Sequence, residues 1–243
     1  MQSANGTTEP PGDRLGLAAR AFGILTSPRA TFERVVADPR WLGILALTVC
    51  TSGVLGAGLL STDFAQRAIL DQQARSMEAF GATMTDEVYE QMELGARFAA
   101  YTTLGSVLIF VPIGLAILAG VLYGAGYGFL GARVSFQQVF AVVAHAGVVY
   151  ALQSLFVVPL NYARESILPP ATLAAFVPML DEASFGFRLL NTIDVFHVWW
   201  VIVLSIGLAV LWRRRTPPIA ATLFAIYGVF VVVGTTLRTM LGF

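Results

Sequence analysis

The sequence lacks lysine and has little charge of either sign. Only 12% of its 243 residues are charged, and all 15 basic residues are arginine. An ordinary soluble domain carries about 25% charged residues. Hydrophobic residues make up 56% of the chain, more than a soluble fold could bury. The composition therefore excludes a soluble domain, and the net charge of zero gives no support for a nucleic-acid partner.

Cysteine and a cleavable leader are the next features that the sequence lacks. Cys50 is the only cysteine, which excludes an intrachain disulfide. The first forty residues contain acids and no apolar core, so we expect no cleaved signal peptide, and the first span serves as the insertion signal. Residues 1–12 are rich in Gly, Thr and Pro and predict a disordered tail.

Long charge-free runs dominate the remainder. About 20 apolar residues in a helix cross a hydrocarbon core about 30 Å thick. We therefore predict an all-α integral membrane bundle of five spans within residues 41–243. The spans cover about residues 41–60, 99–130, 136–159, 195–212 and 219–237. The second is longer than one crossing requires, and Pro112 is a candidate kink.

Segments outside the spans also have helical patterns. Residues 13–40 alternate apolar and arginine faces, which predicts cytosolic helices lying in the membrane interface. Residues 61–97 are polar and predict an outer helical hairpin, with Thr85 as an N-cap. A short interfacial helix is expected at residues 171–180.

The distribution of arginine predicts the orientation. With the N-terminus inside, nine arginines lie on the inner side and six on the outer side. The cluster Arg213–Arg215 is the strongest single indication, because cytoplasmic loops are enriched in basic residues. We expect a cytoplasmic N-terminus, a C-terminus outside, and a location in a bacterial inner membrane.

Small residues recur at every fourth position of the second span, at Ala116, Gly120, Gly124 and Gly128. Such a stripe lets another helix approach closely. One interpretation is packing within the bundle, for which the small residues around Gly53 in the first span offer a complementary surface. The other interpretation is a homo-oligomer formed through the stripe.

Polar residues within the third span form a candidate intramembrane site. They are His145, Gln153 and Asn161. Ionisable groups inside a membrane are costly to bury and are candidates for function. The structural alternative is a neutral imidazole that bonds a helix carbonyl, Gln153 or a neighbouring hydroxyl. Proton transfer or ion binding is the functional one.

Asp194 and His197 are three residues apart and share one helical face at the start of the fourth span. They are too few for a specific metal site, and N-capping by Asp194 explains its position more simply. No nucleophile elbow or phosphate-binding loop is present in the sequence. We therefore predict no catalytic residue, no cofactor and no metal.

Several short motifs occur in a characteristic order. They are Ser27-Pro28 with Thr31-Phe32, Asp38-Pro39-Arg40-Trp41, Met84-Thr85-Asp86-Glu87, Ser135-Phe136-Gln137-Gln138-Val139, and Asp194-Val195-Phe196-His197-Val198-Trp199 followed by Gly207 and the arginine cluster. In this order the chain after Arg20 resembles the Yip (Ypt-interacting protein) domain family, in particular its bacterial branch. His197 departs from the family pattern, where a small hydroxyl residue is usual, so the pair with Asp194 is not carried over as an active site.

The resemblance implies five spans and a cytosolic N-terminus. Eukaryotic members act in vesicle traffic and bind Rab-type GTPases, whereas scaffold or transport roles are suggested for bacterial members. Our first hypothesis is a non-enzymatic membrane scaffold that binds lipid or protein partners. The alternative is a small-solute or ion transporter, and an intramembrane enzyme that would need His145, Asp194 and His197 to meet is the third.

Overall fold

All regular elements among the described residues are helices. The computed structural model describes residues 15–79, 81, 85–181 and 184–241, so the tail predicted at residues 1–12 lies outside them. The elements are α1 (Leu17–Thr26), α2 (Pro28–Ala37), α3 (Leu42–Leu60), α4 (Asp63–Ala79), α5 (Asp86–Leu130), α6 (Phe136–Ala146), α7 (Val148–Ala163), the 3-10 turn η1 (Leu173–Phe176), α8 (Phe185–Thr192), α9 (Val195–Leu211) and α10 (Thr216–Leu241).

Four stretches of helix are long and apolar enough to cross a membrane. They are Leu42–Leu60, Asp86–Leu130, Phe136–Ala163 and Thr216–Met240. The predicted fourth span is the shorter helix α9, whose 17 residues extend about 26 Å at 1.5 Å per residue. The prediction of an all-α membrane protein is confirmed, and four of the five predicted spans have the required length and composition.

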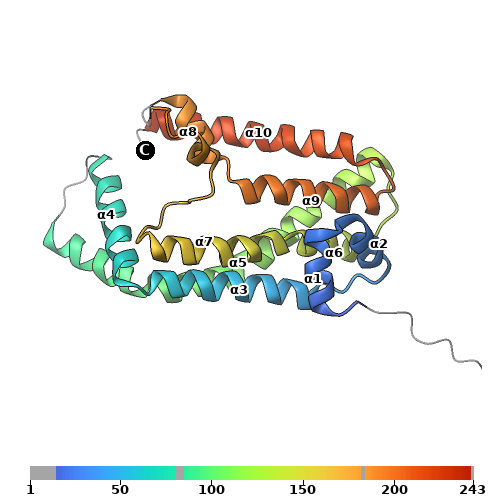
Figure 1. Cartoon of the computed structure of the whole chain (residues 1–243), viewed down its shortest axis with the longest axis horizontal. Coiled ribbons are helices and arrows are strands. Elements are labelled where there is room, and N and C mark those ends of the chain that lie inside the picture. Colours follow the sequence, from blue (N-terminus) through green and yellow to red (C-terminus); the bar gives the residue numbers. More distant parts are fainter. Residues whose placement is uncertain (1–14, 80, 82–84, 182–183, 242–243) are drawn as a thin grey trace, which may run out of the picture.

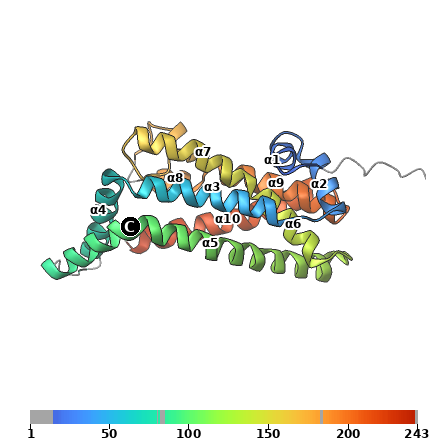
Figure 2. The same ribbon diagram turned by 90° about the horizontal axis from the view of Figure 1, so that it is seen from below.

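The long helices form an elongated bundle with two distinct ends (Figure 1). α3 packs against both α5 and α7, while α9 packs against α2, α6, α7 and α10. At one end lie α1, α2, the start of α6 and the α9–α10 turn with Arg213–Arg215, and we call it the arginine end. At the other, called the loop end, lie α4, α8 and the last turns of α10 (Figures 1 and 2).

Helix α5 continues across the boundary that the sequence analysis placed near residue 98. Its 45 residues extend about 68 Å, and Pro112 lies inside it. It begins where predicted, because Thr85 Oγ1 accepts a hydrogen bond from the Val88 N–H at 3.4 Å. α4 packs against α5 at the loop end. The predicted outer hairpin therefore corresponds to α4 and the first turns of α5.

The predicted third span consists of two helices that meet at Gly147 and extend past residue 159 to Ala163. A Cβ atom at Gly147 would lie 3.0 Å from the Ala144 carbonyl oxygen, so the backbones approach closely there. α6 is the centre of the core, since every residue of 139–146 is buried. The bundle is therefore packed around α6 at the arginine end.

The connection from α7 to α9 differs from the sequence prediction. The interfacial helix expected at residues 171–180 is only the single 3-10 turn η1, and α8 was not predicted. Leu173 N–H donates to the Ile193 carbonyl and Val195 N–H to the Ala171 carbonyl, both at 2.9 Å. These two hydrogen bonds hold the loop against the start of α9.

Candidate functional site

The N-terminal helices α1 and α2 pack against the rest of the bundle. Ile24 of α1 and Phe32 and Val35 of α2 are 0–1% exposed and belong to the main core. Pro28 occupies the first turn of α2, where its missing N–H leaves no hydrogen bond unmade. Each helix thus has a side buried against the protein, since α1 contacts α3, α6 and α7 and α2 contacts α6 and α9. Leu17 and Phe22 of α1 stay exposed, at 38% and 68%.

Gly207 of α9 is the place where Phe32 enters the bundle. A Cβ atom on Gly207 would lie 2.6 Å from Val142 Cγ1 and 2.9 Å from Phe32 Cε1 and Cζ. Real Cβ atoms do not approach carbon this closely, so the ring needs a residue without a side chain. Two residues of the sequence motifs, Phe32 and Gly207, therefore form one packing unit.

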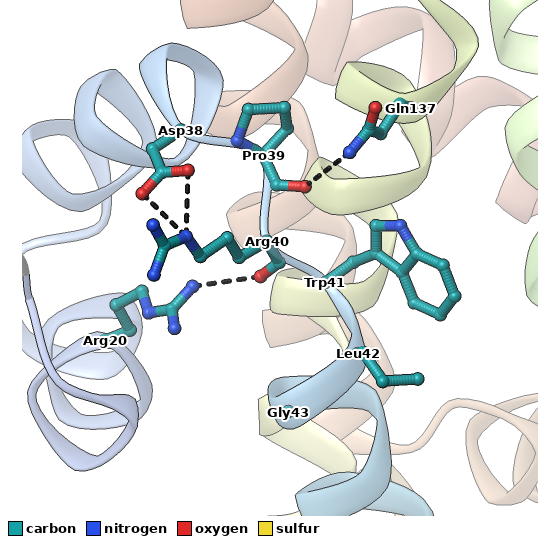
Figure 3. A pocket seen from close by; sticks show the side chains of 8 residues that line it. All are labelled: Arg20, Asp38, Pro39, Arg40, Trp41, Leu42, Gly43 and Gln137. Carbon is teal, nitrogen blue, oxygen red and sulfur yellow. Dashed lines mark hydrogen bonds and ion pairs between the residues drawn. The ribbon is translucent and has the colours of Figure 1, made fainter.

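The segment of residues 38–41, which links α2 to α3, accepts hydrogen bonds from α1 and α6 and contains an ion pair of its own (Figure 3). Gln137 Nε2 donates to the Pro39 carbonyl at 3.3 Å, and Arg20 Nη1 donates to the Arg40 carbonyl at 2.9 Å. The Arg40 guanidinium pairs with Asp38 at 2.9 Å. The segment lines a pocket of about 400 Å³. These contacts tie the connection between α2 and α3 to α1 and α6.

The start of α6 is anchored to the same region. Ser135 and Gln138 form a capping box, in which the Gln138 N–H donates to Ser135 Oγ and the Gln138 side chain accepts from the Ser135 N–H. Gln138 Nε2 also donates to the Val36 carbonyl in α2 at 3.1 Å. One glutamine thus starts α6 and ties it to α2.

A second polar cluster lies at the start of α9. Asp194 Oδ1 accepts hydrogen bonds from the N–H groups of Phe196 (2.7 Å) and His197 (3.2 Å), as an N-cap does. Its other oxygen accepts from Gln153 Nε2 of α7 at 3.0 Å. The carboxylate therefore caps α9 and joins it to α7.

Aromatic side chains surround His197 on the same side of α9. The hydroxyl of Tyr150 and Nδ1 of His197 are 2.8 Å apart, and the Tyr227 ring stacks on the imidazole with centroids 4.8 Å apart. Trp200 packs against both His197 and Tyr150 with tilted rings, whose centroids are 5.1 and 5.6 Å apart. The cluster joins α7, α9 and α10 through half-buried side chains.

Two other motif residues of α9, Phe196 and Trp199, stack on each other with ring centroids 6.4 Å apart. Phe196 also meets Phe156 of α7 at 5.8 Å. Both side chains pack against the core and are only half exposed. They contribute apolar contact around the Asp194 cap.

The predicted intramembrane polar residues do not form one site. His145 is fully buried, and its Nδ1–H donates to the Ala141 carbonyl one turn earlier at 2.7 Å. Gln153 bonds Asp194 instead, and Asn161 is buried near the end of α7. In the described part of the chain, no hydrogen bond or ring contact joins His145 to Gln153, Asn161, Asp194 or His197. The hydrogen bond to the Ala141 carbonyl agrees with the structural interpretation of His145, in which the imidazole bonds a carbonyl of its own helix.

The glycine stripe faces outward rather than into the bundle. Gly120, Gly124 and Gly128 are exposed, and a Cβ atom on any of them would meet nothing within 4 Å. Ala116 alone packs against the core. Packing of the whole stripe within the chain is therefore wrong, because the buried face of α5 carries Ala119, Leu122 and Gly126 instead. In α3, Gly53 meets Leu104 and Val107 of α5.

The sequence did not predict the contacts between helices at these two clusters. Arg20, Gln137 and Gln138 support the segment of residues 38–41, and Tyr150 and Tyr227 complete the cluster around His197. A capping box at Ser135 was the one local signal that pointed to Gln138. Among the described residues, no three His, Cys, Asp or Glu side chains gather as metal ligands. The observed contacts hold helices together and cap them.

Comparison with known proteins agrees with the order of motifs. The sequence profile of the Yip1 domain matches residues 22–236, from α1 to α10. The chain is also 25% identical over 191 residues to membrane protein YknW of Bacillus subtilis (strain 168). That match covers 77% of this chain and 76% of the relative. No solved structure matches the chain.

Proposed function

Because the chain belongs to the Yip1 domain family, we propose that it is a non-enzymatic membrane scaffold with five crossings and a cytoplasmic arginine end. The observation that carries the proposal is the close packing around α6. Residues 139–146 are all buried, and the His145 side chain is 0% exposed. A solute pathway would need polar groups facing a water-filled cavity.

The exposed surfaces of the protein support the scaffold role. At the loop end, the first turns of α5 present Tyr89 and Leu94 with 48% and 56% of their surface exposed. The first turns of α5 and the neighbouring helix α4, which form the hairpin, project from the bundle (Figure 2). Large apolar side chains outside the hydrocarbon are suited to contact a protein or lipid headgroup region. The rigid bundle would hold this hairpin at a set distance from the membrane.

A measurement of solute flux distinguishes the scaffold hypothesis from the transporter hypothesis. We expect proteoliposomes that contain the full chain to show no saturable uptake of ions or small solutes above empty liposomes. The His145→Ala variant is expected to show the same background. Saturable flux that is abolished by His145→Ala would refute the scaffold proposal, and Gln72→Ala, at an exposed position of α4, is the matched control for reconstitution.

Cysteine labelling tests the five crossings. In a Cys50→Ser background, Gln72→Cys and Arg238→Cys should react with an impermeant maleimide added outside. Arg34→Cys and Arg214→Cys should react only after permeabilisation. All four side chains are exposed. If α9 does not cross, Arg214→Cys is outside and Arg238→Cys is inside, so labelling of Arg214→Cys in intact cells would overturn the topology.

A further inference from the structure

A wide groove opens between α5 and α10 at the arginine end. Its volume is about 830 Å³, within the range of about 300–1,000 Å³ that is usual for ligand sites. Apolar side chains from both helices form its walls, among them Val121, Leu122, Phe129, Ile219 and Ile226. The groove is continuous with exposed apolar surface, since Val121, Phe129 and Ile226 are 64%, 89% and 49% exposed. It therefore faces the hydrocarbon.

The turn between α9 and α10 places three cations at the mouth of this groove. Arg213, Arg214 and Arg215 all line it and are exposed. Arg213 adopts a left-handed conformation with φ of 53°, and the Arg214 N–H donates to the Ala209 carbonyl at 2.9 Å, so the chain reverses within three residues. Arg214 also reaches across to α5, with Nη2 3.5 Å from the Leu130 carbonyl oxygen. The arginines thus lie between two helix ends.

The charged residues that line this groove are all positive. The groove is lined by no Asp or Glu, and within the described residues the three arginines take part in none of the ion pairs. Pro217 and Pro218 in the first turn of α10 have no N–H groups, so the donors at the groove include the three guanidinium groups and the unpartnered Trp212 Nε1–H. Guanidinium binds phosphate through paired hydrogen bonds.

We propose that this groove binds an anionic phospholipid, with its phosphate between Arg213, Arg214 and Arg215 and an acyl chain along α5 and α10. The positions agree with those of a lipid in a membrane. The arginines lie at the helix ends, where headgroups are found, and the apolar walls lie along the spans, where acyl chains are found. Basic pockets between membrane helices bind anionic headgroups in this way. A protein partner would need one apolar segment for the groove walls and a separate acidic group for the arginines, whereas a phospholipid has both in one molecule. The inference needs the bundle to be in a bilayer, but not the scaffold role.

Lipid retention by the full chain tests the site. Protein in detergent is incubated with equal amounts of phosphatidylglycerol and phosphatidylcholine of identical chains, and bound lipid is measured by native mass spectrometry. We expect preferential retention of phosphatidylglycerol. Retention should fall about fivefold for each arginine replaced by glutamine, up to the triple variant. Arg→Lys replacements should retain more than Arg→Gln because the charge remains.

Two further variants distinguish the groove from general charge. Arg34→Gln removes a cation from an exposed site on α2 at the same end of the bundle and should leave retention unchanged. Ala125→Phe fills the groove wall with the arginines intact and should reduce retention severalfold, with an unchanged circular dichroism melt as the folding control. Equal retention of both lipids, equal loss in Arg34→Gln, or displacement of the lipid by inorganic phosphate alone would overturn the proposal.

Discussion

Replacing Phe32 by alanine should lower the free energy of unfolding by about 3–5 kcal/mol, the range for a large buried aromatic side chain. The ring is fully buried in the core between α2, α6 and α9, and the space it leaves cannot collapse without moving α2. Phe22→Ala is the matched control, because that ring is 68% exposed in the neighbouring helix α1. Its effect should stay within about 0.5 kcal/mol. Denaturation in detergent, followed by circular dichroism, measures both values.

Gly207 provides an independent measure of the same contact. Gly207→Ala should cost about 1–3 kcal/mol, because the new methyl group meets both Val142 and the Phe32 ring. In the Phe32→Ala background the cost should be smaller, since one of the two clashing groups is gone. Gly228→Ala in α10, where a Cβ atom meets nothing within 4 Å, controls for helix propensity. Additive effects of Phe32→Ala and Gly207→Ala would show that α2 is not inserted against α9.

Replacing Asp194 by alanine is the second change expected to have a large effect. Loss of the cap on α9 costs about 1 kcal/mol, and an unpaired Gln153 amide costs about 1–3 kcal/mol more. The expected loss of about 2–4 kcal/mol is measured by the same denaturation experiment. Asp194→Asn should lose less, because its side-chain oxygen still accepts from the N–H groups of Phe196 and His197.

A double-mutant cycle separates the cap from the link to α7. In the Asp194→Ala background, Gln153→Leu removes the unpaired amide and should restore part of the lost stability. Thr85→Ala, which removes a cap at the exposed start of α5, should cost no more than about 1 kcal/mol. If Asp194→Ala costs no more than Thr85→Ala, the bond between Asp194 and Gln153 does not contribute to stability.

The clusters at the two ends of α9 suggest how the bundle stays together without a large hydrophobic driving force. Lipid chains are as apolar as the helix surfaces, so helices in a membrane associate through close packing and hydrogen bonds. Phe32 against Gly207 supplies packing at the arginine end, and Asp194 with Gln153 supplies hydrogen bonds near the loop end. Both contacts use α9, the shortest of the proposed spans.

The amino-acid sequence was enough to predict the helical class, four stretches long and apolar enough to cross a membrane, and the helix starts at Thr85, Ser135 and Asp194. These features depend on local rules. A span must hide its backbone polar groups from lipid, and a cap satisfies N–H groups two or three residues away. Both rules apply within one helix, so they can be applied to consecutive residues without knowledge of the fold.

Which faces of those helices meet could not be predicted from the sequence and is seen in the three-dimensional structure. Gln138 finds its partner Val36 across 102 positions of the chain, and Gln153 finds Asp194 across 41. The stripe at Gly120, Gly124 and Gly128 is the clearest example of what the sequence does not predict. Small residues permit close packing, but they do not identify the helix that packs against them. Contacts between helices depend on how several helices fit together at once, and no periodicity within a single helix contains that information.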